Sequence, residues 1–140
     1  MNKSRIIHID GTDKTGKDTV RDLLVKETQG NCLVIVRSYL SQIVYSRLYD
    51  RKIDEDFFWN KMKIDFDNGV EFVVLECNLY NAERRFKEHN EKDISILDFE
   101  NHRYAFKMIV EEAQSKGIKI KVFDTSYDTP ADTFNKILES

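Results

Sequence analysis

Four short apolar segments recur along the chain, and stretches of helical periodicity separate them. The apolar segments cover residues 5–9, 32–36, 70–77 and 118–123. Each is rich in β-branched side chains and is bounded by Gly, Asn or Asp, which is typical of buried parallel strands. The pattern therefore predicts four strands.

The intervening segments have apolar residues spaced by three or four positions. In residues 17–28, for example, Val20, Leu23 and Leu24 fall on one face of a helix. Similar spacing predicts further helices over residues 41–49, 54–66, 80–89, 99–116 and 132–138. Strands that alternate with helices indicate an α/β fold of three layers, in which a parallel sheet of about four strands is flanked by helices.

Composition supports a single folded domain over residues 1–140. Charged residues make up 34% of the chain and hydrophobic residues 41%, which is typical of a globular protein with a polar surface. Pro130 is the one proline, and no stretch rich in Ser, Gly or Pro interrupts the chain. The sequence thus predicts no domain boundary.

The charge balance and the cysteines narrow the function classes. Lys and Arg number 22 against 25 Asp and Glu, a net charge of −3, which argues against sequence-independent binding of nucleic acid. Cys32 and Cys77 lie in apolar segments without metal-type spacing and predict buried thiols in a reducing compartment. The apolar run near the N-terminus is too short for a signal peptide or a membrane span. We therefore expect no membrane partner and a location in the cytoplasm. If the protein is viral, this is the cytoplasm of the host.

A glycine-rich loop joins the first strand to the first helix. Its sequence, Gly11-Thr12-Asp13-Lys14-Thr15-Gly16-Lys17, has the spacing G-x-x-x-x-G-K in the order strand, loop and helix. The glycines allow the backbone to wrap around phosphate oxygens, and the helix N-terminus adds its dipole. Lys17 would bring a positive charge to the β and γ phosphates. The loop therefore predicts a nucleotide triphosphate site that includes Gly11, Thr15, Gly16 and Lys17.

The residue after Lys17 departs from the usual pattern. A Ser or Thr whose hydroxyl binds Mg²⁺ normally stands there, whereas this chain has Asp18 followed by Thr19. A carboxylate can also bind Mg²⁺ or its water shell, so Asp18 and Thr19 are the predicted metal ligands. Alternatively, Asp18 only favours the helix N-terminus electrostatically.

With this loop, the sequence resembles the thymidylate kinase family of nucleoside monophosphate kinases, whose loop reads G-x-D-[RK]-x-G-K. The resemblance implies that Asp13 contacts the sugar of the monophosphate nucleotide and that Lys14 assists the transferred phosphate. It also implies ATP and Mg²⁺ as cofactors and nucleotides as the partners of the protein.

Residues 36–45 resemble a second motif of the family, D-R-x-x-x-S-x-x-[AV]-Y. By position, Arg37 would grip the acceptor phosphate, and Ser41 and Tyr45 would line the nucleoside pocket. Val36 stands where the family has an Asp that helps to hold Mg²⁺.

Two further segments resemble parts of the family that close over the donor. Residues 82–86 are similar to the start of the lid helix, which implies that Arg84 and Arg85 approach the phosphates. Residues 122–126 are similar to the loop that touches the adenine ring, which places Thr125 and Ser126 beside the cofactor.

Together these residues predict ATP-dependent phosphoryl transfer to a deoxynucleoside monophosphate, most readily of the thymidine type. The expected catalytic groups are Lys14, Lys17, Arg37, Arg84 and Arg85. A second hypothesis is a non-catalytic or regulatory P-loop module that binds a nucleotide. Two substitutions favour this hypothesis: Val36 in place of an acid and Asp18 in place of a hydroxyl residue. A missing segment also favours it. The family has another strand and one or two helices between the phosphate-loop helix and the second motif, whereas here Gly30 and Asn31 lead directly into the second strand.

The sequence does not favour a general ATPase or GTPase. Such an enzyme needs an acid at the end of a strand for Mg²⁺, for which Glu76 is the one candidate, and the guanine-reading motif N-K-x-D is absent. A small α/β domain with an exposed sheet edge is also suited to form a homodimer.

Overall fold

The computed structural model describes residues 4–12, 15–88 and 96–140. Its centre is a parallel sheet of β1 (Arg5–Gly11), β2 (Cys32–Val36), β3 (Glu71–Glu76) and β4 (Ile120–Asp124), in the order β2-β1-β3-β4. All four predicted strands are therefore confirmed. β1 and β3 are central and buried along most of their length, which explains their nearly continuous apolar sequence.

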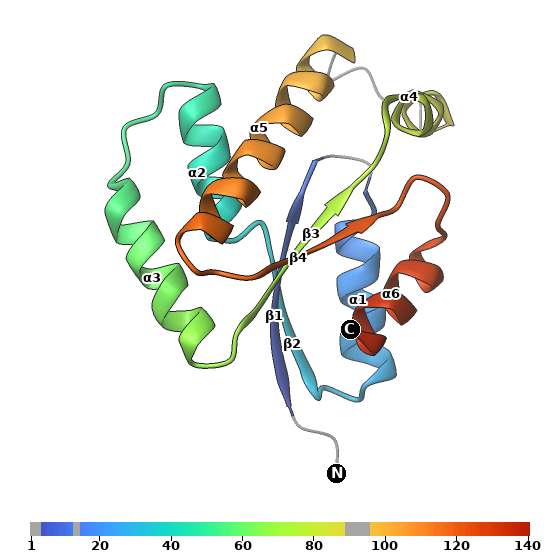
Figure 1. The fold of residues 1–140 in the computed structure, drawn as a ribbon. Helices are drawn as coiled ribbons and strands as arrows, with labels where there is room; N and C mark the ends of the chain where they lie inside the picture. The colour runs from blue at the N-terminus through green and yellow to red at the C-terminus, as the bar shows by residue number, and fades with distance from the viewer. Residues whose placement is uncertain (1–3, 13–14, 89–95) are drawn as a thin grey trace.

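Helices cover both faces of the sheet (Figure 1). α2 (Tyr39–Leu48), α3 (Glu55–Asp67) and α5 (Ile96–Ser115) pack on one face, and α1 (Lys17–Glu27) and α6 (Pro130–Glu139) pack on the other. α4 (Leu79–Glu88) follows β3 at the carboxyl end of the strands. The predicted three-layer α/β architecture is confirmed.

The helix boundaries differ from the expected ones by a few residues at most. The last helix begins at Pro130 rather than at residue 132, because Thr129 and Asp132 form a reciprocal capping box around it. Proline at the first helical position loses no hydrogen bond, since that amide has no partner within the helix. The cap therefore sets the start of α6.

Each face of the sheet has its own apolar core. The core under α2, α3 and α5 contains Phe72, Met62 and Ile109, whereas the core under α1 and α6 contains Ile7, Leu24 and Ile137. Side chains of successive strand residues point to opposite faces, so β3 and β4 contribute to both cores, whereas the apolar residues of β1 and β2 pack in the core under α1 and α6. The two cores hold the strands rigidly and fix the loops that leave their carboxyl ends.

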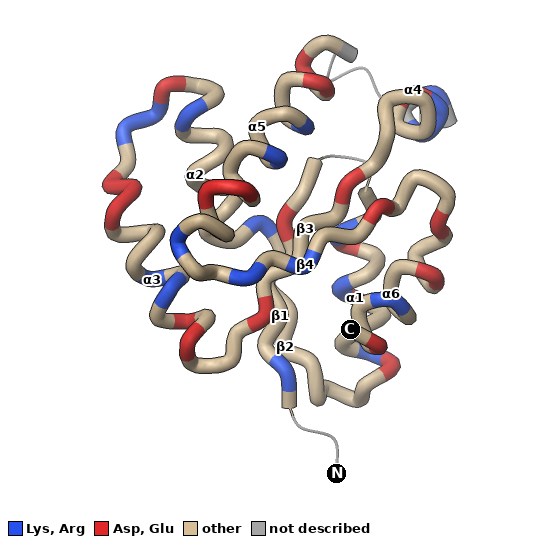
Figure 2. Tube along the Cα trace, in the orientation of Figure 1, with Lys and Arg blue, Asp and Glu red and all other residues tan. Residues whose placement is uncertain are grey.

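Charge is spread over the surface rather than collected on one face. Figure 2 shows acidic and basic residues interspersed over the helices, with several basic residues on α4. Within the described part of the chain, no helix is long and apolar enough to cross a membrane.

Candidate functional site

The glycine-rich loop leaves β1 at a position where only glycine fits. Gly11 has a φ of 144°, and a Cβ atom there would lie 2.2 Å from the carbonyl oxygen of Leu75 on β3. At the other end of the loop, Gly16 has a φ of 79° and is the N-cap of α1. Gly11 and Gly16 thus allow the chain to turn tightly from the sheet into the helix.

The side chain of Lys17 bonds the backbone of this loop. This side chain is buried, and its Nζ donates a hydrogen bond of 2.6 Å to the carbonyl oxygen of Thr12. The hydroxyl of Thr15 donates to the same carbonyl at 2.9 Å. Thr12, Thr15 and Lys17 therefore converge, as a phosphate loop requires. Asp13 and Lys14 lie outside the described residues.

Asp18 and Arg37 meet beside the loop. Asp18 is in the first turn of α1, and its Oδ1 lies 3.6 Å from an Nη of Arg37 and 3.4 Å from an Nη of Arg21. Arg37 is exposed in the connection between β2 and α2. The structure thus brings the predicted acceptor-binding arginine next to the first helical turn after Lys17.

The side chains beside the loop fit a magnesium ion only in part. Asp18 and Thr19 are both exposed at the start of α1, and Mg²⁺ in nucleotide sites takes one or two carboxylates with phosphates and water as the remaining ligands. Asp18 offers one such carboxylate, although it is paired with two arginines. No cluster of three or more His, Cys, Asp or Glu side chains occurs in residues 4–12, 15–88 and 96–140.

Asp10, the residue before Gly11, is an acid that the sequence interpretation missed. It is fully buried, and its carboxylate accepts hydrogen bonds from the backbone N–H and hydroxyl of both Ser38 and Ser41. The apolar pattern predicts a strand that ends at Ile9, one residue short of this acid. An acid directly after an apolar strand and before a glycine loop is the signal that could have revealed it.

The structure places Ser41 and Tyr45 in different surroundings. The Ser41 hydroxyl donates to Asp10 at 2.6 Å. The Tyr45 ring, one turn further along α2, packs edge-on against His102 and Phe106 of α5, with centroid distances of 5.3 and 5.9 Å. The two residues of the second motif therefore lie on one helix but contact different groups.

A pocket of about 170 Å³ opens between α5 and the carboxyl ends of the strands. Its walls are mostly apolar, with charged groups from α5 and β3; the lining residues are Thr12, Val74, Leu75, Glu76, Arg103, Phe106, Lys107, Val110, Glu111 and Val122. The hydroxyl of Thr12 is buried and has no hydrogen-bond partner among the described residues. The pocket thus extends from the glycine-rich loop to the underside of α5.

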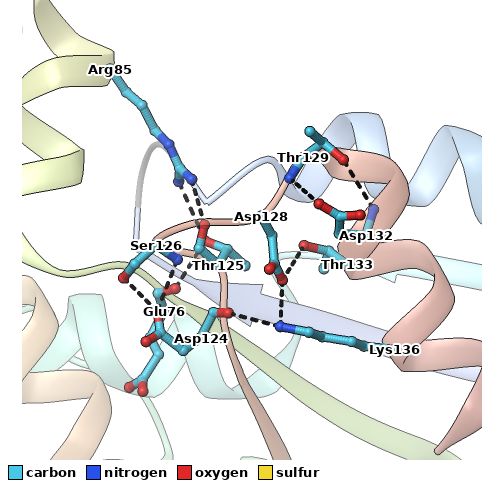
Figure 3. A network of polar contacts seen from close by, with 10 residues as sticks. All are labelled: Glu76, Arg85, Asp124, Thr125, Ser126, Asp128, Thr129, Asp132, Thr133 and Lys136. Carbon is cyan, nitrogen blue, oxygen red and sulfur yellow. Dashed lines mark hydrogen bonds and ion pairs between the residues drawn. The ribbon is translucent and has the colours of Figure 1, made fainter.

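A cluster of hydrogen-bonded polar residues lies at the carboxyl end of β4 (Figure 3). The guanidinium of Arg85 reaches from α4 and donates to the carbonyl oxygen and the hydroxyl of Thr125. Thr125 donates through its backbone N–H and its hydroxyl to the carbonyl oxygen of Glu76, at 2.7 and 2.9 Å. The predicted lid arginine and the predicted adenine loop are thereby connected. Arg84 is exposed on the same helix.

Ser126, the other predicted residue of that loop, is fully buried and binds the strand end. Its hydroxyl and backbone N–H donate to Asp124, and its Oγ accepts from the N–H of Asn78. Burial opposes ionisation of Asp124, but the hydrogen bonds from Ser126 outweigh it and hold the pKa of Asp124 below its usual value. Asp124 is therefore a charged anchor for the loop.

Comparison with known proteins identifies solved structures of similar fold. No protein-family model matches the sequence, and no curated protein sequence matches it. A crystal structure of the YorR protein from Bacillus subtilis, in complex with phosphorylated GDP, superposes with a TM-score of 0.81 at 16% identity, covering 96% of this chain and 94% of that chain. Thymidylate kinase from Candida albicans superposes with a TM-score of 0.59 at 11% identity, over 98% of this chain and 90% of that chain. The chain therefore has a P-loop kinase fold like that of thymidylate kinase.

Proposed function

We propose that this protein transfers a phosphoryl group from ATP to a (deoxy)nucleoside monophosphate, as a thymidylate-kinase-like enzyme, and that residues 1–140 form the single domain that does so. The observation that carries the proposal is the meeting of Arg37 with the first turn of α1, one residue beyond the buried Lys17. A donor site and a cation for a second phosphate are thus adjacent. Such a pair of sites is what phosphoryl transfer between two nucleotides needs.

On the donor side, the loop from Gly11 to Lys17 would hold the ATP phosphates. Lys17 already has its ammonium inside the loop, where Thr12 accepts its hydrogen bond. Because the ammonium is buried, its charge would act on a phosphate through little intervening water. We assign Gly11, Thr15, Gly16 and Lys17 to the phosphates, with Asp13 and Lys14 completing the loop.

On the acceptor side, Arg37 would bind the monophosphate through its planar fork, which matches phosphate oxygens. The pocket beneath α5 would receive part of the nucleoside. An apolar cavity of about 150 Å³ holds a benzene ring, so the pocket of about 170 Å³ has room for one ring system. The unpartnered Thr12 hydroxyl would then face the bound ligand. Tyr45 packs against Phe106, which lines the pocket, and would support that wall from behind.

Magnesium would be held by Asp18, with Thr19 beside it and phosphate oxygens as further ligands. The ion would neutralise negative charge on the phosphates. Asp18 would have to exchange one of its arginine partners for the metal, and both pairs are exposed and therefore weak.

Over the donor, Arg84 and Arg85 of α4 would act as the closing arginines. Arg85 now contacts Thr125, in the loop proposed to touch the adenine together with Ser126. A nucleotide bound in that loop would therefore also meet the helix that carries both arginines.

A non-catalytic nucleotide-binding module is the second candidate. Two departures in the sequence favour it: Val36 stands where the thymidylate kinase motif has an acid, and Asp18 stands where a phosphate loop usually has a hydroxyl residue. A coupled assay with ATP, Mg²⁺ and each deoxynucleoside monophosphate separates the two. Conversion of a monophosphate supports the kinase, whereas ATP binding with no conversion of any monophosphate supports the regulatory module.

The substitution Arg37→Ala tests the assigned roles within the kinase hypothesis. A lost charge-assisted contact costs about 1.5–3 kcal/mol, so we expect the KM for the acceptor to rise about 10- to 100-fold. The affinity for ATP should change little. Arg37→Lys keeps the positive charge but loses the planar guanidinium, so its acceptor KM should lie between those of the wild type and of Arg37→Ala. Equal losses of ATP and acceptor binding would contradict the assignment.

A further inference from the structure

Arg37 has a backbone conformation that an arginine rarely adopts. Its φ is 61°, in the left-handed region, where the Cβ atom is close to the following carbonyl oxygen. The residue lies in the short connection between β2 and α2. Such a conformation persists only when the surrounding structure imposes it.

The surrounding structure that imposes it is the end of β1. The N–H of Arg37 donates to the carbonyl oxygen of Ile9 at 2.9 Å. Directly after Arg37, Ser38 gives its N–H and its hydroxyl to Asp10, at 2.8 and 2.7 Å. Ser41 adds its own N–H at 3.1 Å and its hydroxyl at 2.6 Å. The residues on both sides of the Arg37 side chain are thus fixed to β1.

We propose that Asp10 is the positioning residue of Arg37, an inference that rests on the proposed acceptor role of that arginine. The buried carboxylate holds the turn at residues 37 and 38 in its left-handed form. In this form the guanidinium extends to the first turn of α1, where it lies 3.6 Å from Asp18. Without Asp10 the turn relaxes to negative φ, and the guanidinium leaves the phosphate loop.

Asp10 acts in this proposal through geometry and not through chemistry. Its side chain is 0% exposed, and both of its oxygens are occupied by Ser38 and Ser41. Oδ1 receives three of these hydrogen bonds, and Oδ2 receives the one from the Ser38 hydroxyl. An asparagine can keep the first three and donate to the Ser38 hydroxyl, which is able to reverse its own direction. Asp10→Asn should therefore preserve the turn, and Asp10→Ala should not.

The kinetic test compares these variants with thymidine monophosphate as the acceptor. We expect Asp10→Ala, and the double variant Ser38→Ala with Ser41→Ala, to raise the acceptor KM at least about 10-fold with little change in ATP affinity. Asp10→Asn should restore the wild-type value. Ser46→Ala is the matched control, because Ser46 is a buried serine of the same helix whose hydroxyl donates to the carbonyl oxygen of Ile43, within α2, and not to Asp10. An equal loss in Asp10→Asn and Asp10→Ala would overturn the proposal in favour of a chemical role for the charge.

Dependence on Arg37 is tested by combining the variants. In an Arg37→Ala protein, the further change Ser38→Ala should leave the acceptor KM unchanged, since the group that Ser38 and Asp10 position is already absent. An additional rise of the KM would show that Ser38 acts on the acceptor independently and would overturn the proposal.

A stability test decides the conformational part without any kinase activity. Arg37→Gly and Arg37→Ala both remove the guanidinium, but only glycine accepts a positive φ without strain. With Asp10 present, we expect the glycine variant to have the higher Tm. With Asp10→Ala, the turn is released, and glycine should lose this advantage because it has more freedom to lose on folding. An advantage of the same size in both backgrounds would overturn the proposal. If the protein converts no monophosphate yet shows this Tm pattern, the proposed function fails while the positioning by Asp10 stands.

Discussion

Two of the loops that leave the carboxyl end of the sheet, the one after β1 and the one after β4, are held in different ways. The loop after β1 is fixed by buried groups: Gly11 lies against the backbone of β3, and Asp10 and Lys17 are almost inaccessible to water. The loop after β4 also contains buried residues, Thr125 and Ser126, but its hydrogen-bond network extends to the surface through Arg85 and Lys136. Each loop belongs to one half of the proposed donor site.

This difference predicts how much change each loop tolerates. A buried polar group that loses its partner costs the full desolvation of that group, whereas an exposed ion pair contributes about 0–1 kcal/mol. Changes at the buried groups that hold the ends of the loop after β1, Gly11 and Lys17, should therefore be costly. The loop after β4 should adjust with α4, to which Arg85 connects it.

The largest effect is expected from Gly11→Ala, which tests the rigidity of the loop after β1. The new Cβ atom would lie 2.2 Å from the Leu75 carbonyl oxygen at a φ of 144°. Backbone strain and overpacking together should lower the free energy of unfolding by about 4 kcal/mol. Urea denaturation measures this loss.

Gly30→Ala is the matched control for that experiment. Gly30 also has a positive φ, 82°, but no atom lies within 4 Å of the position that a Cβ atom would take there. Only the conformational cost of about 1–2 kcal/mol should remain. Equal losses at Gly11 and Gly30 would show that the contact between β1 and β3 is not what constrains the loop.

Sequence and structure agree best on the turn between β1 and α1. The glycine spacing predicted a tight turn from strand to helix, and the structure has it, with positive φ at Gly11 and Gly16. That this loop binds phosphate stays a prediction. Asp10 escaped prediction, since its partners Ser38 and Ser41 are 28 and 31 residues away and only the pairing of β1 with β2 brings them near. The contact of Arg85 with Thr125 likewise joins two segments that are 40 residues apart.

The next largest effect is expected from Lys17→Ala, which tests function rather than stability in the same loop. Loss of one preorganised donor to a developing charge lowers catalytic rates about 10²- to 10³-fold. We expect a loss of this size in turnover or in donor binding, measured with the coupled assay and by titration with ATP. Lys26→Ala, an exposed lysine in the last turn of the same helix, should change neither. Retained ATP binding and turnover in Lys17→Ala would remove Lys17 from the proposed site.

Arg85→Ala should have a smaller effect and tests the loop after β4. The change removes the hydrogen bonds to the carbonyl oxygen and hydroxyl of Thr125 and should cost about 1–2 kcal/mol. Because these bonds connect α4 to the loop, the amides of α4 should exchange with solvent faster than those of α1. Lys87→Ala, at an exposed site on α4, is the control. Unchanged exchange in Arg85→Ala would show that the loop does not hold the helix.

The smallest effects concern the pH dependence of the free energy of unfolding, to which His8 on β1 and Asp124 on β4 should contribute in different pH ranges. Burial lowers the pKa of His8 on β1 below 6.5, so the unfolded chain takes up this proton at a higher pH than the folded protein does. Its contribution to stability is therefore complete above pH 6.5 and is lost as the pH falls toward the lowered pKa. For Asp124 on β4, burial is outweighed by the hydrogen bonds from Ser126, and the pKa lies below 3.8. Its contribution is complete well above pH 3.8 and is lost only in more acidic solution.

Unfolding free energies measured from pH 8 to pH 3 should therefore decline just below pH 6.5 through His8. They should decline again in acidic solution, where Asp124 and the other carboxyl groups with lowered pKa, those of Glu55, Glu71 and Asp132, take up protons. His8→Phe keeps a ring against Tyr39 and Phe72 but cannot titrate, and it should flatten the decline just below pH 6.5 alone. Ser126→Ala removes the hydroxyl that holds the Asp124 charge, and it should flatten the decline below pH 3.8 alone. If both variants altered the same range, the ends of β1 and β4 would respond to protons as one unit, and the contrast between a buried and an adjustable loop would not hold.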